Sequence, residues 1–125
     1  MGNCTTCHFD KPGHSLVSDD FCGNFLVPCD GEMHILWQLD PSFFAGGAQS
    51  AGTVSIYYGH SCDEDLTVII TREDFTTEQF QVSNGNTRSL TVLNLNSVAI
   101  VCPNQNQNRN RCEGKYCIDL HYAVE

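Results

Sequence analysis

The chain has 125 residues and carries fifteen Asp and Glu against six Lys and Arg, which gives a formal net charge of -9. This acidic balance repels phosphate backbones and argues against nucleic acid as a partner. The length suffices for one domain with its own hydrophobic core. Because the sequence has no run of eighteen apolar residues and no charged segment followed by an apolar one near its start, we expect neither a membrane span nor a signal peptide.

The first segment, residues 1–20, shows neither the period of a helix nor that of a strand. Such a segment cannot bury enough apolar surface to offset the entropy of ordering it, so we expect a flexible N-terminal connector arm. Its most reactive groups are the thiols of Cys4 and Cys7. Residues 21–125 then form the folded domain.

Strand patterns with turn residues between them fill the rest of the chain. The sequence Asn84-Gly85 predicts a tight hairpin turn, and an Asn- and Gln-rich stretch at 104–111 predicts a solvated loop. The expected strands are 21–27, 33–39, 52–58, 66–71, 79–82, 87–93, 95–101 and 115–124. Eight short strands without a convincing helix predict an all-β domain, an eight-stranded jelly-roll sandwich.

Cysteine is unusually frequent. The eight cysteines are Cys4, Cys7, Cys22, Cys29, Cys62, Cys102, Cys112 and Cys117. Such a number indicates disulfides in an oxidising compartment or metal in a reducing one, and the expected lack of a secretion signal conflicts with the first. A protein made in a cytoplasm and oxidised later, after its cell lyses, would resolve the conflict.

Two of these cysteines fall on polar strand faces. In the last strand Cys117 alternates with Ile118, so it shares its face with charged residues and points outward. In the first strand Cys22 lies opposite the face of Phe21 and Phe25. The first and last strands of a jelly roll are commonly neighbours, so we expect both thiols on one outer surface. Since unpaired cysteines are usually buried, both need a partner.

The chain resembles the endospore appendage (Ena) subunits of spore-forming bacilli. The resemblance lies in the opening Met-Gly-Asn-Cys, in Asp-Phe-Cys at 20–22 and in the ending Gly-Lys-Tyr-Cys-Ile-Asp-Leu-His-Tyr-Ala-Val at 114–124. It implies a jelly roll whose connector thiols, Cys4 and Cys7, form intermolecular disulfides with Cys22 and Cys117 of neighbouring subunits. It further implies a non-enzymatic homopolymer, also joined through sheet edges. The resulting pilus-like fibre lies on the spore surface, and its subunit is made in the mother-cell cytoplasm without a signal peptide.

Two hypotheses of other classes stay open. The first is a jelly-roll module that binds carbohydrate and uses its cysteines only as intrachain disulfides. The second is a redox or metal protein, because Cys4-Thr-Thr-Cys7-His8 matches the C-x-x-C-H of haem attachment and offers three zinc ligands. Haem needs an apolar pocket and zinc needs a fourth ligand, so we expect no metal and no cofactor. The opening also fits an N-myristoylation pattern.

No catalytic site is expected. Cys117 and His121 share a strand face but lie about 13 Å apart along the strand, beyond the reach of a nucleophile and its base. Cys102 and Cys112 bracket the Asn- and Gln-rich loop, and an intrachain disulfide and buried free thiols are equally compatible with their positions. The sequence does not place Cys29 or Cys62. Trp37 is expected in the core.

Overall fold

All eight elements among the described residues are β-strands, which confirms the predicted fold class. The computed structural model describes residues 15–40, 42, 49–59, 64–104 and 111–124. The strands are β1 (Ser15–Pro28), β2 (Met33–Gln38), β3 (Ser50–Tyr58), β4 (Leu66–Arg72), β5 (Thr77–Val82), β6 (Asn86–Leu93), β7 (Leu95–Val101) and β8 (Arg111–Val124). No helix within these ranges is long and apolar enough to cross a lipid bilayer.

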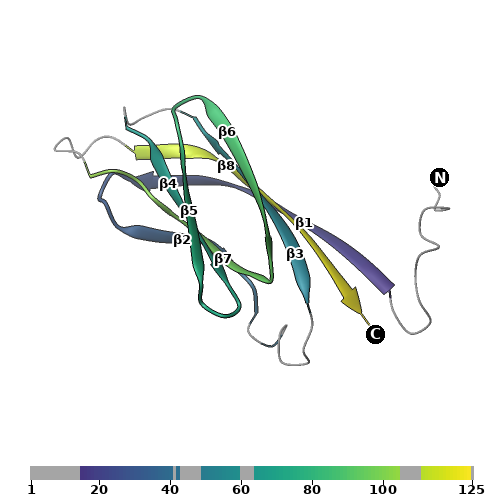
Figure 1. Ribbon diagram of the computed structural model, residues 1–125. Helices are drawn as coiled ribbons and strands as arrows, with labels where there is room; N and C mark the ends of the chain where they lie inside the picture. The colour runs from purple at the N-terminus through teal and green to yellow at the C-terminus, as the bar shows by residue number, and fades with distance from the viewer. Residues whose placement is uncertain (1–14, 41, 43–48, 60–63, 105–110, 125) are drawn as a thin grey trace, which may run out of the picture.

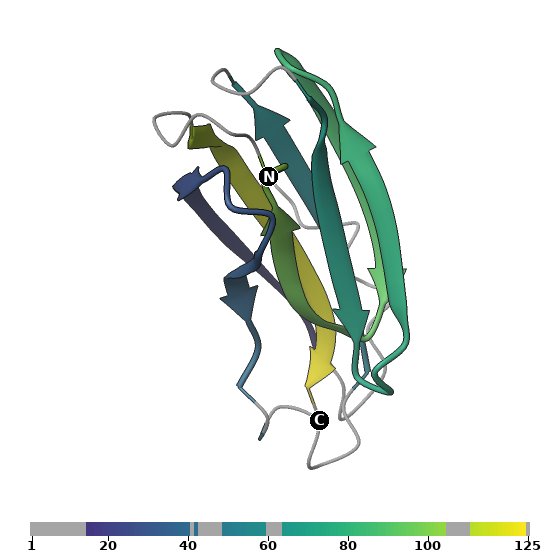
Figure 2. The same ribbon diagram turned by 90° about the vertical axis from the view of Figure 1, so that its left-hand side faces the viewer.

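The strands form two four-stranded antiparallel sheets that face each other (Figures 1 and 2). One sheet has the order β1-β8-β3-β6 and the other the order β2-β7-β4-β5. Consecutive strands lie in different sheets, except β4 and β5, which pair with each other within one sheet; this is the strand arrangement of a jelly roll. The first and last strands, β1 and β8, lie side by side along their full lengths, as predicted.

The core lies between the sheets and follows from the period of two in each strand. In β3, Val54, Ile56 and Tyr58 are fully buried, whereas the residues between them are more exposed. In β4, Val68 and Ile70 alternate in the same way from the opposite sheet. Each fully buried aliphatic side chain of this kind contributes about 1.5–3 kcal/mol relative to exposure. Alternation therefore builds the core that fixes the outer faces.

Strand β1 begins at Ser15, six residues before the predicted start, so the end of the predicted arm belongs to the sheet. Residues 15–20 pair with 119–124 of β8. The hydroxyl of Tyr122 donates a 2.7 Å hydrogen bond to Asp19 Oδ2, and Ser18 Oγ lies 2.8 Å from His121 Nδ1. Aspartate is a poor strand former, which hid this segment from sequence analysis; the long partner strand supplies the ladder that local preference does not.

The Asn84-Gly85 turn does not close a hairpin, contrary to the prediction. The strands that it joins, β5 and β6, belong to different sheets. The turn itself forms as its residues require: Gly85 has φ +79°, and the Asn86 N–H donates to the Ser83 carbonyl at 3.1 Å. Sequence identified the reversal of the chain but not the strand that each side would pair with.

Strand β8 is also longer than predicted and begins at Arg111. Its Gly114 faces Phe25 of β1 and Tyr58 of β3 in the ladder. A Cβ atom built on Gly114 would lie 2.6 Å from Phe25 Cζ and would also strike the Tyr57 carbonyl oxygen. Glycine is therefore required here for the three strands β1, β8 and β3 to approach.

Candidate functional site

The outer face of the sheet β1-β8-β3-β6 carries a disulfide. Cys22 and Cys117 are directly opposite each other in the β1–β8 ladder, with their Cα atoms 4.1 Å apart, and the structure joins them within one chain. Cys22 is exposed and Cys117 is half-buried. The expectation that the two strands would bring both sulfurs to one outer surface is confirmed; that they would be bonded to each other was not predicted.

The row of residues beside the disulfide is polar. Ser55 of β3 lies next to Cys117, and Ser89 of β6 follows it. The two serine hydroxyls lie 2.7 Å apart, and one step along the strands the hydroxyls of Thr53 and Thr91 lie 2.8 Å apart. Small hydroxyl side chains cannot cover their neighbours, so this face leaves the disulfide open to solvent.

Two carboxyl groups border the disulfide on one side. Asp20 and Asp119 face each other in the next outward row, two residues along each strand from the cysteines. A hydrogen bond to Asp119, together with its negative charge, raises the pKa of Asp20, while His121 nearby lowers it by a smaller amount. This side of the disulfide is therefore electronegative at neutral pH.

The other side of the disulfide is different in charge and shape. Lys115 faces Asn24 in the preceding outward row. A hollow follows, lined by Leu26, Tyr57, Glu113 and Lys115 among others. Leu26 and Tyr57 are exposed. Lys115 lies in the row next to the two sulfurs on one side, with Glu113 one row farther away, and two carboxyl groups lie in the next row on the other side.

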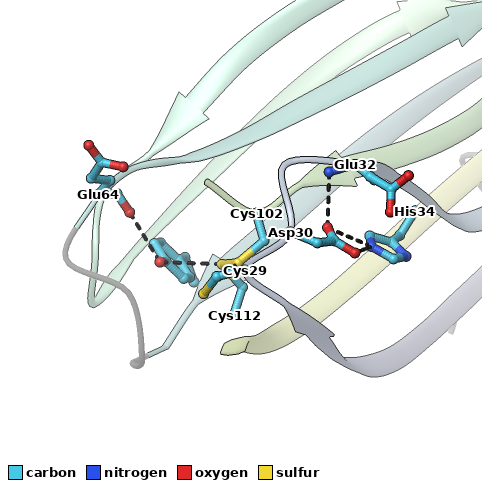
Figure 3. Close-up of a disulfide and its surroundings, with 8 residues drawn as sticks. Cys29, Asp30, Glu32, His34, Glu64, Cys102 and Cys112 are labelled. Carbon is cyan, nitrogen blue, oxygen red and sulfur yellow. Dashed lines mark hydrogen bonds and ion pairs between the residues drawn. A yellow bond between two sulfur atoms is a disulfide. The ribbon is translucent and has the colours of Figure 1, made fainter. Parts of the chain in front are cut away.

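A second group of sulfurs lies at one end of the sandwich, where β1 and β7 end and β8 begins (Figure 3). Cys102 and Cys112 form a disulfide that joins the two sheets, not the two strands of a hairpin, because β7 and β8 belong to different sheets. Cys29 Sγ lies 3.2 Å from Cys102 Sγ, and Cys29 is itself disulfide-bonded. All three side chains are buried.

A short turn beside this group is held by one carboxylate. Asp30 Oδ1 accepts a 2.9 Å hydrogen bond from the Glu32 N–H, and His34 Nε2 lies 3.1 Å from Asp30 Oδ2 (Figure 3). The Glu32 N–H, and to a lesser extent His34, lower the pKa of Asp30. These contacts fix the chain between Cys29 and β2, so they hold Cys29 in place.

The structure bears on the other sequence hypotheses in part. Cys117 is in a disulfide and His121 contacts Ser18, so the two do not form a nucleophile and base. Trp37, which was expected in the core, is partly buried and packs against it, and its ring lies 5.6 Å from that of Phe21. Cys4, Cys7, His8 and Cys62 lie outside the described residues.

Two features of these sites could not be predicted from the sequence. Nothing in the local pattern indicated that Asp20 would face Asp119, because the register of β1 was not known before Phe21. Nothing placed Cys29 beside Cys102, since the two are 73 residues apart and meet only where the ends of two strands pack. The only indication in the sequence was that Asp119 and Cys117 are two residues apart in β8, so their side chains lie on the same face of the strand.

The fold and the outer disulfide define a class: a small jelly-roll sandwich that carries an exposed disulfide between its first and last strands. Within that class, the family model described as endospore appendages matches residues 4–124. The chain belongs to the endospore appendage family.

One solved structure with a TM-score above 0.5 has a similar fold. The chain is similar to a structure described as Bacillus endospore appendages that form disulfide-linked pili, with a TM-score of 0.68 and 16% identity over 99% of this chain and 100% of that one. A structure of infectious bursal disease virus strain Gx matches with a TM-score of 0.40 and 12% identity over 90% of this chain and 32% of that one. No curated protein matches the chain.

Proposed function

We propose that this chain is a structural subunit of a disulfide-crosslinked, pilus-like fibre on the spore surface, made in the mother-cell cytoplasm and oxidised as it assembles. Membership of the endospore appendage family supports the fibre, and the similar solved structure is described as a disulfide-linked pilus. One observation carries the proposal for this chain: a disulfide on an exposed outer face, at Cys22 and Cys117. Burial is the usual state of cysteine, so an exposed pair on a polar face calls for a role outside the core.

The arm thiols Cys4 and Cys7 are the proposed partners of this pair. A disulfide exchanges with an incoming thiolate only where the thiolate can approach a sulfur, and β1 is an edge strand with its outer face uncovered by any described residue. The arm between Cys7 and Ser15 has about seven residues and spans roughly 24 Å when extended. This length lets the arm of one subunit reach along β1 and β8 of the next.

The crosslinking step is a thiol–disulfide exchange. A thiolate at Cys4 or Cys7 attacks one sulfur of the Cys22–Cys117 bond; that bond breaks, a mixed disulfide between subunits forms, and the other acceptor sulfur leaves as a thiolate. The first step conserves the number of disulfides and needs no oxidant. The second arm thiol and the released thiol then join by losing two electrons and two protons to a low-molecular-weight disulfide.

The asymmetry around the disulfide favours one direction of approach. A thiolate is repelled by Asp20 and Asp119 and attracted by Lys115. Glu113 also lines the hollow but lies one row farther from the sulfurs than Lys115, so the arm enters from the side of Lys115. Leu26 and Tyr57 provide exposed apolar surface there for the apolar part of an arm. The charge pattern thus supports a defined polarity for the crosslink.

The test is peptide mapping of assembled material without reduction. Fibres grown from an equal mixture of ¹⁴N- and ¹⁵N-labelled protein should yield hybrid-mass peptides that join Cys4 or Cys7 to Cys22 or Cys117. The hybrid mass separates crosslinks between chains from an arm that folds back on its own domain. Fibres in which Cys22 and Cys117 remain joined only to each other would refute the scheme.

Matched variants sharpen the result. Cys22→Ser with Cys117→Ser should abolish the crosslinks and leave a folded domain, as should Cys4→Ser with Cys7→Ser. Cys102→Ser with Cys112→Ser removes the same number of sulfurs from the core and should leave the crosslinks in place. Loss of interchain bonds in this last variant, with the domain still folded, would contradict the assignment to the outer pair.

Lateral assembly is proposed through sheet edges. The edge strands are β1 and β6 in one sheet and β2 and β5 in the other. Open edges present unpaired backbone groups to a second copy, and Lys or Arg side chains, which commonly guard such edges, are few in this chain. Pairing of this kind does not depend on sulfur, so particles treated with reductant should keep their lateral contacts; complete dissolution to monomers by reductant alone would contradict it.

A further inference from the structure

Three buried sulfur atoms meet at the end of the sandwich. The Sγ atoms of Cys29, Cys102 and Cys112 all lie within 4.8 Å of one another, and those of Cys29 and Cys102 are 3.2 Å apart. They come from three separate places in the chain: the end of β1, the end of β7 and the start of β8. The three side chains are at most 8% exposed. Packing of the two sheets, not the disulfide alone, holds them together.

The oxidised state is only one of two states that this cluster must pass through. Translation delivers every cysteine as a thiol, and a subunit that folds before it is oxidised brings the three thiols together in one buried group. In a tetrahedral zinc–thiolate site with Zn–S bonds of about 2.3 Å, the sulfur atoms lie about 3.8 Å apart. In the oxidised structure Cys102 and Cys112 are bonded to each other, and Cys29 Sγ lies 3.2 Å from Cys102 Sγ and within 4.8 Å of Cys112 Sγ. Reduction of the bond lets the two sulfurs move apart toward the spacing that zinc requires.

We propose that the reduced subunit binds one zinc ion through the thiolates of Cys29, Cys102 and Cys112, and that oxidation releases it. Thiolates select zinc over the magnesium and calcium ions that prefer oxygen. Binding displaces three thiol protons, and water fills the fourth position of the ion. The metal joins the ends of β1, β7 and β8, and so ties together the same two sheets that the Cys102–Cys112 disulfide joins later.

Release balances as a two-electron oxidation. Cys102 and Cys112 give two electrons to one molecule of a low-molecular-weight disulfide, which leaves as two thiols after taking up two protons. The Cys102–Cys112 bond forms, the zinc ion departs, and Cys29 takes up a third proton. A second molecule of the same oxidant takes two electrons and two protons from Cys29 and one further cysteine thiol of the protein; these two sulfurs form the disulfide that contains Cys29, and the oxidant leaves as two thiols. The ion thereby protects these sulfurs from premature pairing and leaves no free thiolate behind.

The experiment uses full-length protein that carries Cys4→Ser and Cys7→Ser, so that the arm's C-x-x-C-H pattern cannot bind metal. Reduced protein is loaded with Zn²⁺ without oxygen, desalted and analysed by elemental mass spectrometry, and Co²⁺ serves as a spectroscopic probe for tetrahedral thiolate ligation. We expect one metal ion per chain when the protein is reduced and none when it is oxidised. One ion on the oxidised protein, or none on reduced protein that circular dichroism shows to be folded, would overturn the proposal.

Single variants assign the ligands. Cys29→Ser or Cys112→Ser should weaken zinc binding at least tenfold, whereas Cys22→Ser with Cys117→Ser, a pair outside the cluster, should leave it unchanged. Because core variants can fail to fold, the reduced protein with only the arm changes is also probed with iodoacetamide. Zinc should slow alkylation of Cys102 and Cys112 and not of Cys22. If zinc left the alkylation rate of each of these three cysteines unchanged, the assignment would be overturned.

Discussion

Asp20 and Asp119 face each other across the β1–β8 ladder, and a hydrogen bond between the two carboxyl groups raises the pKa of Asp20. The pair lies one outward row from the Cys22–Cys117 disulfide, about 7 Å away at the rise of a strand. Two like charges directly opposite each other in a ladder destabilise it. The same surface therefore holds both the proposed crosslinking bond and a local repulsion.

The first prediction concerns this repulsion. The pKa of Asp20 in the folded protein is raised above its ordinary value of 3.8, so the folded state holds this proton more tightly than the unfolded state does. The resulting stabilisation is fully present below pH 3.8 and is lost as the pH rises through the raised pKa. Asp119→Asn should therefore raise the unfolding midpoint in urea at pH 7, with the gain vanishing in acid. Glu113→Gln, on the same face and opposite Leu26, changes net charge equally and should not show this pH dependence.

The second prediction concerns the rate of exchange at Cys22–Cys117. Removing one carboxylate with Asp119→Asn should speed reduction by an anionic thiol such as glutathione by about threefold at low salt, from Coulomb repulsion in water at about 7 Å. The cationic thiol cysteamine should not be accelerated, and high salt should remove the effect. Rates are followed by non-reducing mass spectrometry; equal acceleration of both thiols would show that the carboxylate acts through folding and not through charge.

The third prediction compares the two disulfides. In the chain-entropy model, the ten-residue separation of Cys102 and Cys112 corresponds to about 3 kcal/mol, and the 95-residue separation of Cys22 and Cys117 to about 4.7 kcal/mol. Replacing each pair with Ser in the isolated subunit and measuring urea unfolding should give losses in this order. The opposite order would indicate that packing around the buried bond outweighs the loop that the outer bond closes.

The fourth prediction separates the arm from strand β1. Deletion of residues 1–14 should leave urea unfolding nearly unchanged and prevent covalent fibres, because it removes both arm thiols and no residue of the sheet. Deletion of residues 1–20 should also lower the unfolding midpoint, since it removes six ladder residues and the contacts from Asp19 to Tyr122 and from Ser18 to His121. Equal stability of the two deletions would mean that residues 15–20 contribute nothing to the sheet.

The fifth prediction concerns Gly114. Gly114→Ala should destabilise the domain by about 1–3 kcal/mol or more, because the added methyl group meets the Tyr57 carbonyl and the Phe25 ring. At Gly23 a Cβ atom meets only the end of the Tyr116 side chain, which can turn away, so Gly23→Ala should cost less. Urea unfolding of both variants measures the difference, and a Gly114→Ala protein as stable as Gly23→Ala would show that the strands can separate to admit the methyl group.

Sequence patterns predicted those parts of the fold where local preference and tertiary pairing agree. The bounds 95–101 of β7 match the structure, and β4 differs only by the added Arg72. Alternation also placed Cys117 on an outward face before its neighbours were known. In each case apolar and polar residues alternate within the strand, so the local sequence carries the information.

The failures have one physical origin, which is pairing with distant residues. The acidic residues Asp19 and Asp20 do not favour a strand, and β1 extends through them because β8 continues opposite. The contact between Cys29 and Cys102, and the bond between Cys22 and Cys117, depend on which strands become neighbours. Turn residues at Asn84-Gly85 reverse the chain whether or not the flanking strands pair, so they did not reveal the crossing between sheets.

The early start of β1 determines how a pulled fibre would carry tension. In the proposed arrangement, force enters a subunit through its own arm at Ser15 and leaves through Cys22 to the arm of the next chain, so the shortest covalent path crosses only residues 15–22. That segment runs along β8, so force along the strand loads its ladder bonds in shear, all at once, and not one after another. The rest of the sandwich then lies outside the covalent path that carries the tension. The fibre can therefore bear a force that would unfold the domain if the force passed through the core.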